Sequence, residues 1–107
     1  MDCEYLQVLT AAGSEREAGA IAAALIERRL AACVQIAGPV KSVYRWQGEI
    51  ENAEEWQCTA KTKASHWDAV EAAIRERHSY EEPEIVATPI VAGSTGYLRW
   101  IDDSLAD

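Results

Sequence analysis

Several residue types are scarce in this sequence of 107 residues. Phenylalanine is absent, methionine occurs once, and there are three prolines and three cysteines. Basic residues are also few, since ten Lys and Arg stand against eighteen Asp and Glu and give a formal net charge of −8. A protein that binds nucleic acid neutralises phosphates with Lys and Arg, so this charge argues against a nucleic-acid partner. It also opposes docking on an anionic membrane surface.

Long apolar runs and targeting signals are not visible either. No apolar stretch approaches the roughly 20 residues of a membrane span, and Met1 to Glu4 show no basic region leading into an apolar segment. Cys3, Cys33 and Cys58 are an odd number and lack CxxC spacing, which predicts free thiols in a reducing compartment. From these features we expect a cytoplasmic protein, and the length predicts one domain over residues 1–107.

The apolar residues that are present follow two periodicities in alternating segments of the chain. Apolar residues at intervals of three and four predict helices over about 15–30, 65–78 and 97–105. Extended segments are predicted over about 4–10, 32–46, 49–62 and 85–91, with a turn at Gln47-Gly48 and a bulge at Gly38-Pro39. The order βαββαβ plus a short C-terminal helix predicts an α+β, ferredoxin-like fold with a long hairpin between the second and third strands.

Local signals mark where the helices begin. Ser14 and Glu17 fit a capping box, in which each side chain bonds the backbone N–H of the other residue. Ser65, with Asp68 three residues later, is predicted to cap the second helix.

The hairpin is too long for so small a sheet, and it carries Trp46 and Trp56. Large aromatic side chains on an unpaired hairpin need cover. We therefore expect a homo-oligomer with strand pairing between subunits, while a hairpin that curls over its own sheet remains the alternative.

Few residues offer catalytic chemistry. The sequence contains no P-loop, GxGxxG, GxSxG or HExxH motif, so no enzyme is predicted. His66 and His78 would be rotated by about 120° on one helix and do not share a face. We expect His66 to face solvent and His78 to be either a polar helix cap or a metal ligand. Lys61 is either a surface lysine or holds an anion or a carboxylate such as that of Glu84.

Several segments together point to a known family. They are residues 31–34 (AACV), 44–50 (YRWQGEI), Glu55 with Lys61-Thr62, 78–85 (HSYEEPEI) and 97–101 (YLRWI). In this order, from about residue 5 to 105, the chain resembles the CutA1 family of divalent-cation-tolerance proteins. The resemblance implies a ferredoxin-like fold, a homotrimer built by strand exchange between hairpins, no established reaction, and binding of copper or other divalent metals.

The resemblance also implies site residues. Carried over position by position, the residues around the cleft between subunits are Cys33, Trp46, Glu55, Lys61, Tyr80 and Glu84. His78 matches a family histidine and is the predicted metal ligand. Leu9 replaces a cysteine that some relatives use for copper, and Arg77 replaces a second histidine, so we expect weak binding of Cu²⁺ or another divalent cation and no required cofactor.

Three functions follow from this. The leading prediction is a non-enzymatic trimeric protein of the cytoplasm that binds divalent cations and has a role in metal tolerance. The first alternative is a trimer like the PII signalling proteins that binds a small anionic metabolite between subunits through Lys61, Tyr80 and Trp46. The second alternative is a trimeric scaffold for partner proteins.

Overall fold

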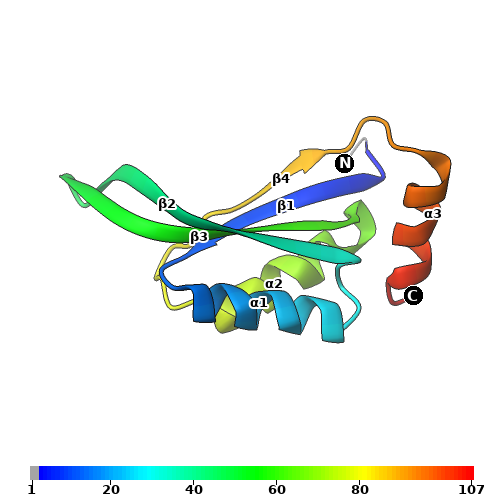
Figure 1. The fold of residues 1–107 in the computed structure, drawn as a ribbon, viewed down its shortest axis with the longest axis horizontal. Coiled ribbons are helices and arrows are strands. Elements are labelled where there is room, and N and C mark those ends of the chain that lie inside the picture. The colour runs from blue at the N-terminus through cyan, green and yellow to red at the C-terminus, as the bar shows by residue number, and fades with distance from the viewer. Residues whose placement is uncertain (1–2) are drawn as a thin grey trace.

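The computed structural model describes residues 3–107, and its elements follow the predicted order (Figure 1). They are β1 (Tyr5–Ala12), α1 (Glu15–Glu27), β2 (Cys33–Trp46), β3 (Glu49–Lys63), a 3₁₀ turn η1 (Ala64–His66), α2 (Trp67–Arg77), β4 (Ile85–Pro89) and α3 (Thr95–Ser104). Residues 1 and 2 lie outside the described part. They belong to the predicted domain and to the N-terminal segment that shows no targeting signal.

The sheet has four strands in the order β2-β3-β1-β4, and every neighbouring pair is antiparallel. Helices α1 and α2 lie on one face of this sheet, and α3 lies at the end opposite the hairpin turn (Figure 1). The predicted α+β, ferredoxin-like fold is confirmed. No helix among residues 3–107 is long and apolar enough to cross a membrane.

The core lies between the sheet and the two helices. Ile21 and Leu25 of α1 and Ile74 of α2 are each 1% exposed and pack against the inward-facing residues of β1 and β3. Burying one such side chain contributes about 1.5–3 kcal/mol. Cys58 belongs to this cluster, and burial raises its pKa to about 11. The prediction of free cysteines is confirmed for Cys3, Cys33 and Cys58.

The helix starts differ from the predictions in two respects. The Glu17 backbone N–H donates to Ser14 Oγ at 3.1 Å, as predicted, but the Glu17 carboxylate accepts from the Ser79 N–H at 2.8 Å and does not return to Ser14. The cap predicted at Ser65 is wrong, because η1 precedes α2 and Ser65 Oγ contacts Nδ1 of His66 at 3.1 Å. A tertiary contact thus takes the Glu17 carboxylate from its local role, whereas the hydroxyl of Ser65 contacts the adjacent side chain of His66.

The hairpin has the predicted turn and bulge. Gln47 and Gly48 have φ values of 50° and 83°, the left-handed pair of a type I′ turn. The register shifts between Ala37 and Val40 at the predicted bulge. A Cβ at Gly38 would lie 2.6 Å from Cδ1 of Trp56, so the backbone can approach this ring only at a glycine.

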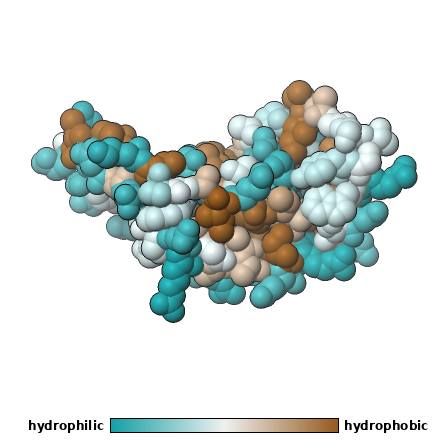
Figure 2. Space-filling model, viewed as in Figure 1, coloured by the Kyte–Doolittle hydropathy of each residue, from teal (hydrophilic) through white to brown (hydrophobic). Residues whose placement is uncertain are grey.

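Beyond the bulge the hairpin extends past the rest of the sheet. The pairing of β1 with β3 ends at Trp56, so residues 40–55, here called the hairpin arm, pair only with each other. Val43 and Ile50 on the arm are 64% and 63% exposed. Figure 1 shows the arm projecting from the sheet, and Figure 2 shows hydrophobic side chains gathered at its tip.

The opposite end of the molecule is held by polar contacts. Arg29, two positions after the last residue of α1, has a φ of 57°. Its guanidinium donates to the carbonyls of Ser104 and Asp103 at 3.2 and 3.1 Å. Lys63 Nζ lies 3.0 Å from the Asp102 carboxylate. His66 Nε2 lies 2.7 Å from the carbonyl of Ala106, so the prediction that His66 faces solvent is wrong.

Candidate functional site

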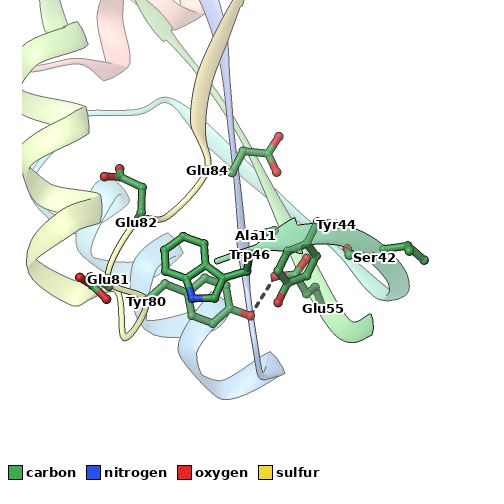
Figure 3. Close-up of a pocket in the computed structure, with 10 residues that line it drawn as sticks. Ala11, Ser42, Tyr44, Trp46, Glu55, Tyr80, Glu81, Glu82 and Glu84 are labelled. Atoms are coloured by element: carbon green, nitrogen blue, oxygen red, sulfur yellow. Dashed lines mark hydrogen bonds between the residues drawn. The ribbon is translucent and has the colours of Figure 1, made fainter. Parts of the chain in front are cut away.

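A cavity of about 620 Å³ lies between the hairpin arm, the end of β1 and the segment that joins α2 to β4. The arm contributes four residues of β2, three of which alternate along the strand, and the joining segment contributes a tyrosine followed by three glutamates within four positions. The lining residues are Ala11, Ser42, Val43, Tyr44, Trp46, Glu55, Tyr80, Glu81, Glu82 and Glu84 (Figure 3).

A hydrogen bond at the inner side of the cavity joins two of these side chains. Tyr80 Oη donates to Glu55 Oε2 at 2.8 Å, and the two side chains point toward one another in Figure 3. Burial, and then this contact with the Glu55 carboxylate, raise the pKa of Tyr80 well above its ordinary value. The hydroxyl therefore keeps its proton at neutral pH and acts as the donor.

The segment at residues 78–80 is held against the end of β1. The Tyr80 N–H donates to His78 Nδ1 at 3.2 Å, and His78 Nε2 lies 2.8 Å from the carbonyl of Ala11. Because Nδ1 accepts a hydrogen bond, Nε2 carries the proton and donates to Ala11. Both ring nitrogens of His78 are thus engaged within the chain, and the imidazole must give up a hydrogen bond to bind a metal.

The outer side of the cavity is acidic. Glu81, Glu82 and Glu84 are exposed, and Glu82 forms an ion pair with Arg75 at 3.5 Å. The described lining residues include no Lys or Arg. The carboxylates do not converge, because residues 3–107 contain no group of three or more His, Cys, Asp or Glu side chains placed to hold a metal ion.

The six predicted cleft residues fall into two groups. Four of them line the cavity and come from β2, β3 and the segment between α2 and β4. They are Trp46, Glu55, Tyr80 and Glu84. Cys33 and Lys61 lie elsewhere, opposite one another in the register of β2 and β3. Whether all six meet between subunits stays a prediction.

Lys61 does not have the partner suggested for it. Its Nζ donates to Gln35 Oε1 at 3.2 Å, so the suggested contact with Glu84 is wrong within one subunit. Lys61 lies six positions after Glu55 on β3, which is about 20 Å along the strand. The lysine is therefore remote from the cavity, and an anion held jointly by Lys61, Tyr80 and Trp46 stays a prediction, as does the role of a scaffold.

Sequence reasoning missed part of the cavity wall. Ser42, Tyr44 and Trp46 line it together because alternate residues of a strand share a face. This period of two was visible in the sequence and would have added Ser42 and Tyr44 to Trp46. The position of Glu81 and Glu82 depends on how the loop folds, and no local pattern indicates it.

The chain matches known proteins over nearly its whole length. A family model described as "CutA1 divalent ion tolerance protein" matches residues 6–104. The "Divalent-cation tolerance protein CutA" of Thermus thermophilus is 41% identical over 97 residues, which cover 91% of this chain and 94% of the relative. The protein of the same name from Pectobacterium atrosepticum is 34% identical over 103 residues, covering 96% and 94%.

Solved structures agree with this match. The crystal structure of CutA1 from Shewanella sp. SIB1 superposes with a TM-score of 0.96 at 37% identity and covers 100% of both chains. A structure from Archaeoglobus fulgidus superposes with a TM-score of 0.90 at 39% identity over 94% of this chain and 97% of that one. That protein is described as the periplasmic divalent cation tolerance protein CutA.

The last description contradicts the cytoplasmic location predicted above. That prediction rested on the missing signal and on the free cysteines. Neither feature determines a compartment, and the prediction is wrong.

Proposed function

Because the chain belongs to the CutA1 divalent ion tolerance family, we propose that it is a non-enzymatic protein that binds divalent cations and contributes to tolerance of them. The observation that carries the proposal is the match over residues 6–104, together with relatives named for divalent-cation tolerance. The net charge of −8 supports it, since it favours cationic ligands.

The proposal includes a homotrimer. Strands β2 and β4 form the two edges of the sheet, and each edge has unpaired backbone groups that a second copy can pair. The hairpin arm supports this with Val43 and Ile50, whose apolar side chains have little cover within one subunit.

We place the cation where more than one subunit supplies ligands. The described residues of one chain do not form a three-ligand site, and a single imidazole binds copper weakly. His78 is the proposed imidazole ligand, and it would exchange the hydrogen bond from the Tyr80 N–H for the metal. Binding then depends on assembly and is modest in affinity.

The test is a calorimetric titration of the assembled protein with Cu²⁺ and with Zn²⁺. His66 is the only other histidine of the sequence, so His66→Gln is a matched control for His78→Gln. We expect His78→Gln to weaken binding by about tenfold or more and His66→Gln to leave it unchanged. Absence of binding by the wild-type protein would overturn the cation proposal, and equal affinities of the two variants would remove His78 from the site.

A further inference from the structure

The carboxylates of the cavity do not suit a metal ion. Hard divalent cations need several oxygen ligands at about 2.0–2.6 Å from one point. Here Glu55 lies at the inner side, whereas Glu81, Glu82 and Glu84 are spread along the outer side of a cavity of about 620 Å³ (Figure 3). This spacing suits a larger ligand whose positive charge is distributed along its length.

Aromatic side chains form the walls between these carboxylates. Tyr44, Trp46 and Tyr80 all line the cavity, and the first two are 42% and 39% exposed. The face of an aromatic ring attracts ammonium groups, and Trp does so most strongly. The walls therefore also favour a cation with an organic skeleton, whose methylene groups can pack on the rings.

Within residues 3–107 of one subunit, Glu55 has no cationic partner. It is 7% exposed, and its one side-chain hydrogen bond comes from the neutral hydroxyl of Tyr80. No ion pair within residues 3–107 involves it. Burying a charged carboxylate is costly unless a cation compensates it. Because Glu55 lines the cavity, a ligand in the cavity can supply the missing charge.

We propose that this cavity binds a linear organic diamine or polyamine. One ammonium group binds Glu55 beside the rings of Trp46 and Tyr80, and the chain extends so that a second positive group lies near Glu81 and Glu84. Tyr80 keeps Glu55 in place by donating to its Oε2. This ligand class is distinct from the metal ions proposed above and does not depend on metal binding.

The experiment is a calorimetric titration of the assembled protein with 1,4-diaminobutane, with 1,4-butanediol as the neutral analogue of equal length. Glu55→Gln removes the buried charge and keeps the shape of the side chain. Glu54→Gln is the matched control, because it makes the same change one residue earlier on β3, outside the cavity lining. We expect saturable binding of the diamine, none of the diol, a loss of about tenfold or more in affinity for Glu55→Gln, and no change for Glu54→Gln.

A second pair of variants keeps the test decisive if Glu55→Gln does not fold. Trp46→Leu removes the ring from the cavity, and Trp100→Leu removes a similarly exposed ring from α3. We expect only Trp46→Leu to lower the affinity for the diamine.

Three results would overturn the proposal. They are no saturable binding at about 1 mM diamine, equal weakening by Glu55→Gln and Glu54→Gln, or binding of the diol with the same affinity. An equal loss of affinity in the two variants would mean that the diamine binds only through the net negative charge of the protein. A Cu²⁺ and Zn²⁺ titration of the wild-type protein separates the two proposals, since metal binding without any diamine binding rejects only this one.

Discussion

The two ends of this molecule differ in where their apolar side chains find cover. In the packed body, formed by the three helices, β1, β4 and residues 56–63 of β3, side chains such as Val8 and Ile74 are 1% exposed. In the hairpin arm, Val43 and Ile50 are more than 60% exposed although the backbone is fully paired across the hairpin.

The difference teaches that backbone pairing and side-chain burial are separate requirements. The body meets both within one chain, because α1 and α2 cover the sheet (Figure 1). The arm meets only the requirement for backbone pairing. A second subunit would cover its exposed side chains. Mutations in the body should therefore affect folding, and mutations in the arm should affect assembly.

The largest effect is expected in the body. Ile74→Ala leaves a cavity under α2, because Ile74 is 1% exposed and belongs to the core cluster. We expect the free energy of unfolding to fall by about 2–5 kcal/mol, as measured by urea denaturation at fixed protein concentration. A loss below about 1 kcal/mol would show that the core is not the main source of stability.

The next effect lies at the bulge where body and arm meet. Gly38→Ala places a Cβ 2.6 Å from the Trp56 ring and 3.0 Å from the Glu55 carbonyl, and we expect a loss of about 1–3 kcal/mol in thermal denaturation. Gly19→Ala is the control. A Cβ added there meets nothing within 4 Å beyond its chain neighbours and its own helix backbone, and α1 gains about 0.5–1 kcal/mol from alanine. Similar losses in both variants would contradict the tight contact at Gly38.

A smaller effect on folding is expected in the arm. Ile50→Ser should change the unfolding free energy of a subunit by about 0.5 kcal/mol or less, because the side chain is already exposed. The mass measured by light scattering should fall, if the arm covers a neighbouring subunit. Ile26→Ser, at an exposed position of α1, is the control that should leave the mass unchanged. An unchanged mass for Ile50→Ser would reject the assembly role of the arm.

The smallest effect is expected at the ion pair of Lys63 and Asp102. The hydrogen bond from Lys63, followed by that from Tyr5, lowers the pKa of Asp102 from its ordinary 3.8. The stabilisation is therefore present above pH 3.8 and is lost as the pH falls through the lowered pKa. The Asp102 contact also raises the pKa of Lys63 from 10.5, so the pair is lost again as the pH rises through that raised pKa.

Thermal denaturation of the wild-type protein and of Asp102→Asn at a series of pH values tests this pH dependence of stability. The wild-type protein should be slightly more stable than the variant at neutral pH, and the difference should disappear in acid, whereas Asp103→Asn should show no such trend. A difference that persists in acid would mean that charge is not its cause. The effect is small because the pair is exposed to solvent.

Most of the fold could be predicted because its signals are local. Period-two and period-3.6 patterns marked the strands and helices, and Gln47-Gly48 marked the turn. The capping contacts of Glu17 and Ser65 could not be predicted in full. The partner of Glu17 is Ser79, which is remote in sequence, and Ser65 contacts the adjacent His66.

The candidate site was only partly predictable. Trp46, Glu55, Tyr80 and Glu84 came from the family resemblance and share the cavity. Lys61 also came from the resemblance but does not line the cavity, because it lies six positions along β3 from Glu55. The engaged nitrogens of His78 depend on the backbone of Ala11, far away in the sequence, and no spacing rule indicates such a contact.

The contacts that hold α3 also have a consequence for the time course of folding. Arg29 and Ser104 are 75 residues apart in sequence, and Tyr5 and Asp102 are 97 apart. Contacts of such long range form late, after the local hairpin and helices. The docking of α3 should therefore complete the folding reaction, and weakening its contacts should speed unfolding while leaving the folding rate almost unchanged.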